Sequence, residues 1–312
     1  MSFLRWIRDQ PYLLLTLTSL FWAGNAIVGR AIAGKIPPIA LAEFRWIAAF
    51  LIVLPFAWRD LSRDLPVIRR HFGLLTILAF TGITGFNTLL YWSLERTTAI
   101  NATLMQSSAP LMIGLLSFIL YRDALTRLQI SGIGVSLVGV AAIVSGGDPA
   151  RIFALSLNDG DLTIIFALVL YALYSALLRR RPGMGQLSFL AFTIGWGAIL
   201  LLPGFVMELA TGARFAPLDT PMVGALLYVS IFPSILAYLF FNRGVELIGA
   251  NRAGPFFHLI PLFGVLLAVL FLGERPGMHH VVGILLILSG VMIASRGSRG
   301  GKNRVAEKGA AL

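Results

Sequence analysis

The sequence has no cysteine and few charged residues. Because none of its 312 residues is Cys, disulfides, thiolate catalysis, iron–sulfur clusters and cysteine-ligated zinc sites are excluded. Only 12% of the residues are charged, whereas soluble domains average ~25%. Hydrophobic residues make up 57% of the chain, and the mean hydropathy is +0.85. Too little charge is present to cover a soluble fold of this size, so we expect most of the chain to lie in lipid.

Long uncharged apolar stretches divide the chain into ten candidate membrane spans. A bilayer core requires ~20 apolar residues per helix. Backbone polar groups in lipid must be satisfied within the segment, and the stretches lack the alternation of strands, so we predict helices. The first stretch follows Arg5 and Arg8 as in a signal peptide, but we expect it to stay as a span because more spans follow. The predicted spans are residues 11–33, 39–57, 72–94, 98–121, 126–145, 160–179, 186–208, 220–242, 250–272 and 277–295.

The distribution of Lys and Arg explains the net charge of +11. With ten spans and both termini in the cytoplasm, eighteen of the 25 basic residues fall in cytoplasmic segments and six in external ones. This bias follows the positive-inside rule. Topology therefore accounts for the charge, and no nucleic-acid partner is predicted. We expect residues 297–312 to form a disordered basic cytoplasmic tail near anionic lipid.

The two halves of the chain repeat each other at an offset of 151 residues. This offset aligns Pro110 with Pro261 and Gly139 with Gly290. We predict two five-helix units, residues 1–150 and 151–296. Because five is odd, the second unit enters the membrane from the opposite side, so the units are inverted. Inverted repeats are typical of secondary transporters, whose substrate site lies near the midplane where the halves meet.

The repeated segments also resemble a known family. Residues 101–145, with Pro110, and residues 250–296, with Pro261, each resemble the EamA unit of the drug/metabolite transporter superfamily. The Trp-Ala-Gly-Asn sequence at 22–25 is similar to the opening helix of that family. The resemblance implies a ten-helix fold with a central cavity in the inner membrane. Within the superfamily the chain as a whole is most similar to YddG-type exporters of aromatic amino acids.

Two departures from related transporters narrow the substrate class. The first span has no acidic residue, whereas the four-helix multidrug relatives use a membrane-embedded Glu for cation export. Arg45 is the only base in the middle of a predicted span, and relatives that carry phosphorylated sugars would need several basic residues deep in the pore. The sequence therefore disfavours cationic drugs and phosphorylated sugars.

Polar and aromatic residues inside the spans recur at matched positions of the two units. Polar groups are costly in lipid, so they usually face the bundle interior or a cavity. Aromatic walls suit a substrate with a flat apolar part, and amides suit its amino or carboxylate group. The alternative is interhelical hydrogen bonding, worth ~0.6 kcal/mol per contact; His258 alone is as easily a packing residue. The candidate substrate-binding residues are Trp22, Asn25, Asn87, Tyr91, Gln106, Tyr171, Tyr174, Tyr238, Asn242, Phe257 and His258.

Three further residues are candidates for a role in the transport cycle. Pro110 and Pro261 remove helix hydrogen bonds, so we predict kinks that shape the cavity or act as hinges. Glu43 is the deepest acid and is a possible gate or proton site. A salt bridge from Glu43 to Lys35 or Arg30 is the alternative.

These features predict an inner-membrane exporter of aromatic amino acids or related neutral metabolites, working by alternating access as a monomer. A broader exporter or facilitator of amino acids and metabolites is the alternative, and a non-transporting membrane sensor or assembly protein is the alternative of another class. No carboxylate dyad, nucleophile–His–acid set or HExxH motif is present, so an enzyme is not predicted. No cofactor or metal site is predicted.

Overall fold

The structure is a computed structural model that describes residues 7–32, 35–94, 109–122, 125–145, 147–148, 150, 159–213, 219–272 and 277–297. The regular elements of these residues are helices. Those of the first half are α2 (Pro11–Ile32), α3 (Pro38–Arg63), α4 (Leu65–Arg70), α5 (Phe72–Ala79), η1 (Phe80–Gly85), α6 (Phe86–Leu94), α8 (Ala109–Tyr121) and α9 (Arg127–Val144). Those of the second half are α11 (Asp159–Leu177), η2 (Leu178–Arg180), α12 (Gln186–Ala210), α13 (Thr220–Ser230), η3 (Ile231–Leu236), α14 (Ala237–Ile248), α15 (Ala250–Ala253), η4 (Gly254–His258), α16 (Leu259–Leu272) and α17 (Met278–Gly297).

Several helices are long and apolar enough to cross a bilayer. Among the described residues, five helical stretches meet this criterion: Pro38–Arg63, Phe72–Ser93, Leu162–Arg180, Gln186–Ala210 and Thr220–Ile248. Shorter apolar helices accompany them. Large apolar side chains also cover the outside of the bundle; Phe56, Leu270 and Phe271 are each at least 74% exposed. A surface of this kind requires lipid as its solvent, so the protein is an all-helical, multi-pass membrane protein.

Most described helices begin close to the starts of predicted spans. α3 ends at Arg63, six residues after the predicted end, and the first part of span 98–121 lies outside the described residues. Several elements also recur at the offset of 151. η1 and η3 are both π-helices, and Phe80 and Ile231, where they begin, are one offset of 151 apart. α9 and α17 begin at Arg127 and Met278, which are separated by the same offset. A π-helix is rare and often marks a functional site. Its recurrence at one register is therefore strong support for the internal repeat.

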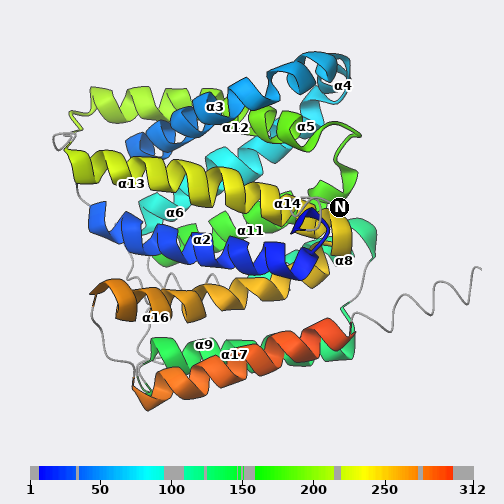
Figure 1. Ribbon diagram of the computed structural model, residues 1–312, viewed down its shortest axis with the longest axis vertical. Helices are drawn as coiled ribbons and strands as arrows, with labels where there is room; N and C mark the ends of the chain where they lie inside the picture. Colours follow the sequence, from blue (N-terminus) through cyan, green and yellow to red (C-terminus); the bar gives the residue numbers. More distant parts are fainter. Residues whose placement is uncertain are drawn as a thin grey trace, which may run out of the picture.

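Helices of the two halves interleave. α3 packs on α12, and α9 packs on α17, so equivalent helices pair at the two edges of the bundle (Figure 1). Between these edges, α2 packs on α14 and α16, while its equivalent α11 packs on α6 and α8. α2 begins and α17 ends at the same end of the bundle (Figure 1). The first helix of each half is therefore inserted into the other half, which brings both halves to one central region.

Glycines allow α9 and α17 to approach closely. A Cβ on Gly139 would lie 2.7 Å from the carbonyl oxygen of Gly283, and one on Gly132 would lie 2.6 Å from that of Gly290. Ser136 donates a hydrogen bond of 3.3 Å to the carbonyl of Ile287, its equivalent in the other half. Small residues of this kind are the usual basis of close helix packing in membranes.

α3 and α12 are antiparallel and are fastened at both ends by carboxylates. Near the end of α12, Glu208 accepts hydrogen bonds from the backbone N–H groups of Ile39 and Ala40, at 3.1 and 2.7 Å. After the end of α3, Asp64 accepts one from the N–H of Gly185, the residue before α12, at 2.8 Å. Each carboxylate satisfies N–H groups that a helix start leaves unpaired. The two carboxylates and their three hydrogen bonds together form the carboxylate clamp of this helix pair.

Candidate functional site

Six aromatic side chains meet in the centre of the bundle. Trp22 lies at the hub, with ring centroids 5.8 Å from Tyr171, 6.1 Å from Tyr238 and 5.3 Å from Phe257. The geometries are tilted or edge-to-face, which aromatic quadrupoles favour. α2, α11, α14 and η4 supply the rings, so both halves contribute. We call this set the aromatic cluster: Trp22, Tyr171, Tyr174, Tyr238, Phe241 and Phe257.

Amide side chains bind two of the three tyrosine hydroxyls of the aromatic cluster. Tyr174 donates to the Oδ1 of Asn242 at 2.6 Å. Tyr238 donates to the carbonyl of Gly82 at 2.5 Å and accepts from the Nδ2 of Asn87 at 3.3 Å. The ring of Tyr174 lies so close to Gly82 that a Cβ there would overlap it, so the π-helix η1 requires glycine at this position.

Arg45 is buried beside the aromatic cluster. It is 1% exposed. Its Nε donates to the hydroxyl of Ser234 at 2.5 Å, and its Nη1 donates to that of Tyr91 at 2.5 Å. The guanidinium also lies 4.5 Å from the ring of Trp46, which itself packs edge-to-face on Tyr238.

A cavity of about 870 Å³ opens beside the aromatic cluster. Asn242 lines it while also bonding Tyr174 of the cluster, so one side chain separates the cavity from the central aromatic residues. Arg122, Arg181 and Arg252 line it as well, together with one acid, Glu246. The volume is within the ~300–1,000 Å³ of small-molecule sites. The cavity is thus polar, positively charged and large enough for an amino acid.

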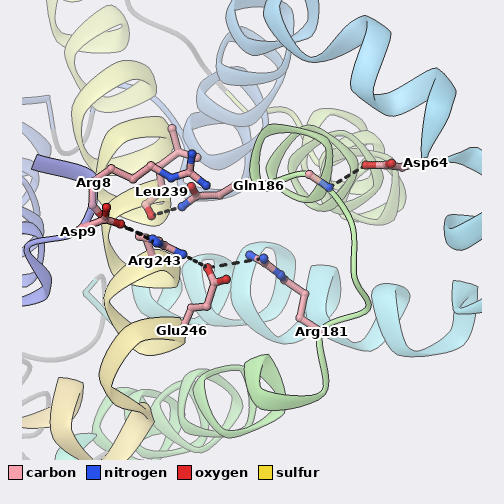
Figure 2. A network of polar contacts seen from close by, with 9 residues as sticks. Arg8, Asp9, Asp64, Arg181, Gln186, Leu239, Arg243 and Glu246 are labelled. Atoms are coloured by element: carbon pink, nitrogen blue, oxygen red, sulfur yellow. Dashed lines mark hydrogen bonds and ion pairs between the residues drawn. The ribbon is translucent and has the colours of Figure 1, made fainter. Parts of the chain in front are cut away.

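Ion pairs close one rim of this cavity. Glu246 lies 3.1 Å from Arg243 and 3.7 Å from Arg181, and Arg243 also pairs with Asp9 at 2.8 Å. Figure 2 shows this chain of contacts, which joins the residues before α2 to α14 and to the segment that follows η2. The carboxylate of Glu246 is therefore paired with Arg181 and Arg243, and it does not neutralise Arg122 or Arg252 of the cavity.

Four predicted residues have buried polar atoms that no described residue satisfies. They are the Oδ1 of Asn25, the hydroxyl of Tyr171, both ring nitrogens of His258 and both carboxylate oxygens of Glu43. The expected alternative for Glu43 was a salt bridge to Lys35 or Arg30. The bond to Lys35 is not formed, because neither oxygen of Glu43 has a partner, and the side chain of Arg30 lies outside the described residues. Unsatisfied buried groups are costly and usually mark functional sites.

The remaining predicted residues are placed as follows. Gln106 lies outside the described residues. Pro110 is the second residue of α8. Pro261 is the third residue of α16 and follows the 3₁₀ turn η4, so it lies where the helix changes from 3₁₀ to α geometry. A 3₁₀ stretch within a helix often marks a hinge.

The sequence did not single out Phe241 or Arg45 for the site. Phe241 lies three residues after Tyr238 and therefore on the same helix face, which helical spacing alone would have shown. The signal for Arg45 was that it is the only base in the middle of a predicted span. Phe241 was overlooked because the candidates were chosen by matched polar positions, and its equivalent, Leu90, is apolar. Arg45 was considered only as evidence against phosphorylated substrates and was not paired with a residue of the other half.

A membrane-embedded bundle with a polar central cavity and no soluble domain among the described residues has the architecture of a transporter. The sequence matches the EamA-like transporter family over residues 10–145 and 158–296. The chain belongs to this family, whose members are transporters and not enzymes.

Individual relatives agree with this assignment. The chain is 30% identical to the uncharacterized transporter YyaM of Bacillus subtilis, over 91% of this chain and 93% of the relative. It is 24% identical to the uncharacterized inner membrane transporter YicL of Salmonella typhimurium, over 91% and 94%. It is 25% identical to a probable terminal-alkyne amino-acid exporter of Streptantibioticus cattleyicolor, over 80% of each chain.

A crystal structure 20% identical in sequence superposes with a TM-score of 0.75, over 93% of this chain and 97% of the other. This likeness supports the fold.

Proposed function

We propose that the protein exports aromatic amino acids, or related small neutral metabolites, from the cytoplasm across the bacterial inner membrane. The observation that carries this proposal is the aromatic cluster with its amide partners Asn87 and Asn242, beside the cavity of about 870 Å³. Flat rings can stack among Trp22, Tyr171 and Phe257, while amides and charged groups take the polar end of an amino acid. The overall similarity of the sequence to the YddG-type exporters of aromatic amino acids supports the same substrate class.

In the proposed architecture ten transmembrane helices form two inverted five-helix units, residues 1–150 and 151–296. Residues 297–312 form a basic tail, and both termini are cytoplasmic. The two family matches, 10–145 and 158–296, and the interleaved packing of equivalent helices support the division. The arginines around the cavity belong to segments that the positive-inside rule assigns to the cytoplasm. The structure then corresponds to a state open to the cytoplasm.

Transport proceeds by alternating access in this proposal. The rings of the aromatic cluster are packed against one another, so they block the path on the side away from the cavity. Substrate enters from the cavity and separates the rings, while the helices bend near Pro110 and Pro261. Glu43, buried without a partner among described residues, is the proposed gate or proton site. The protein works as a monomer because each copy contains both halves of the site.

A second candidate is a broader amino-acid exporter. The relative from Streptantibioticus cattleyicolor is named for an amino acid with a terminal alkyne, which is not aromatic. The cavity arginines and Asn242 favour the amino-acid backbone whatever its side chain.

Transport assays separate these candidates. Purified protein is reconstituted in liposomes, and initial uptake of labelled phenylalanine, tryptophan, threonine and leucine is measured. We expect phenylalanine and tryptophan to exceed threonine by about tenfold, since stacking on aromatic side chains contributes ~1 kcal/mol or more per contact. Equal rates above background for all four would favour the broader exporter. Background rates for all four would contradict both amino-acid candidates.

A further inference from the structure

Arg45 carries a charge in the core that the described residues orient but do not neutralise. Arginine stays protonated in proteins. Burying such a charge in a membrane protein is costly, and intramembrane charges usually pair or take part in function. At 1% exposure, Arg45 is among the largest fully buried side chains of the protein.

The partners of Arg45 are neutral hydroxyls. Ser234 accepts from Nε while it donates its own proton to the carbonyl of Val229, at 2.6 Å. Tyr91 accepts from Nη1. Glu43, two residues away in the sequence, does not pair with Arg45, because neither of its oxygens has a hydrogen-bond partner. Among described residues no carboxylate bonds the guanidinium, and Nη2 has no acceptor there.

The position of Arg45 joins the two halves at the aromatic cluster. Ser234 belongs to the π-helix η3 and lies one turn before Tyr238. Tyr91 lies one turn after Asn87, which bonds Tyr238. The guanidinium is therefore held between equivalent helices of the two halves, next to the rings that bind the proposed substrate.

We propose that Arg45 binds the carboxylate of the substrate, so that the protein selects α-carboxylate-bearing aromatic compounds over the corresponding amides and amines. A carboxylate is the group that a planar guanidinium binds best, through two parallel hydrogen bonds. Nη2 is free to donate, and the Tyr91 hydroxyl is replaceable as the acceptor of Nη1. This inference rests on the proposed function, since it names a chemical requirement of the same site.

Ligand-dependent thermal stabilisation of purified protein tests this proposal without requiring transport. A ligand that binds only the folded state raises the melting temperature with its concentration, which gives an apparent Kd. The ligands are phenylalanine and phenylalaninamide. The variants are Arg45→Gln and Arg45→Lys, with Arg69→Gln as the matched control, an exposed arginine of α4 that does not line the cavity.

We expect the wild type and Arg69→Gln to bind phenylalanine at least about tenfold more tightly than phenylalaninamide, as a charge-assisted hydrogen bond provides. In Arg45→Gln this preference disappears through weaker binding of phenylalanine, while the Kd of phenylalaninamide changes less than about twofold. Arg45→Lys retains part of the preference, because lysine keeps the positive charge but lacks the planar guanidinium that forms two parallel hydrogen bonds with a carboxylate.

Three outcomes would overturn the proposal while leaving the proposed function in place. They are equal wild-type affinity for both ligands, an unchanged preference in Arg45→Gln, and equal weakening of both ligands, which indicates a structural role. If the wild type binds neither ligand, the proposed function itself fails. If Arg45→Gln does not fold, Arg45→Lys decides, because it keeps the charge but cannot form the two parallel hydrogen bonds. We then expect a reduced preference for phenylalanine, and an unchanged one would count against Arg45.

Discussion

At the scale of single residues, some equivalent positions of the two halves lie in contact. Asn87 and Tyr238 are 151 residues apart, the offset of the repeat, and they form a hydrogen bond. Trp22 and Tyr171 lie at equivalent places in α2 and α11, 149 residues apart, and their ring centroids are 5.8 Å apart. The physical reason is that equivalent residues near the axis relating two halves must face each other. The same rule did not single out Arg45, which was not paired with a residue of the other half, and it assigns no ligand to the unsatisfied Oδ1 of Asn25.

The aromatic cluster makes a prediction about Trp22 and Tyr174. Trp22→Ala removes the hub of the cluster, and Tyr174→Ala removes a ring together with its bond to Asn242. We expect each to reduce uptake of labelled phenylalanine about tenfold or more, because each deletes a ring that the substrate would stack on. The measurement is initial uptake into liposomes, normalised to monodisperse reconstituted protein.

The matched control for these variants is Trp58→Ala. Trp58 is 61% exposed on the outer surface, so its loss leaves the cluster intact and transport near the wild-type rate. Folded Trp22→Ala and Tyr174→Ala proteins that transport normally would show that the rings are packing residues only.

At the scale of elements, helix positions followed from apolar length, but details of their ends did not. The spans from 72 and from 220 were predicted as single helices, yet each contains a π-helix, η1 or η3. Hydropathy does not report hydrogen-bond register, so this feature was invisible in the sequence. The carboxylate clamp of α3 and α12 was missed for a similar reason. Asp64 and Glu208 lie far apart in the sequence, and only the antiparallel packing brings each to the start of the other helix.

The clamp predicts a pH-dependent contribution to stability from Asp64. Burial alone would raise the pKa of this carboxyl, but the hydrogen bond from Gly185 and the nearby Arg63 outweigh it and lower the pKa below its ordinary value of 3.8. Because the folded pKa is the lower one, the stabilisation is present above pH 3.8 and is lost as the pH falls toward the folded value. Asp64→Asn should therefore lower stability by about 1 kcal/mol at neutral pH and by less near pH 3.

Thermal melts of detergent-purified protein at the two pH values measure this difference. Glu208→Ala, which frees two N–H groups at the start of α3, should cost about 2 kcal/mol. The control is Asp60→Asn, because Asp60 pairs only with the exposed Arg63 and has no part in the clamp. A loss in Asp64→Asn that is the same at both pH values would contradict the assigned role of the charge.

At the scale of the whole molecule, helix number and packing both support the proposed inverted units. Five helices per unit, as proposed, would require inversion, and the Lys and Arg distribution supports the proposed orientation. Antiparallel packing of the equivalent helices α3 and α12 is what an axis in the membrane plane produces. The sequence could not predict which end of the path would be open. Which end is open depends on the small free-energy difference between two conformations built from similar halves. The hydropathy and charge pattern of either half does not report this difference.

The absence of native cysteine allows a direct test of inversion. α3 and α12 begin at Pro38 and Gln186, so the equivalent of Ser62 is Ala210, 148 residues later. Both residues are exposed, and a single cysteine at either position should not disturb the fold. In sealed right-side-out vesicles, a membrane-impermeant maleimide should label Ala210→Cys rapidly and Ser62→Cys only after the vesicles are opened. Equivalent positions of parallel units would instead lie on one side, so labelling of both cysteines in sealed vesicles, or of neither, would rule out the inverted arrangement.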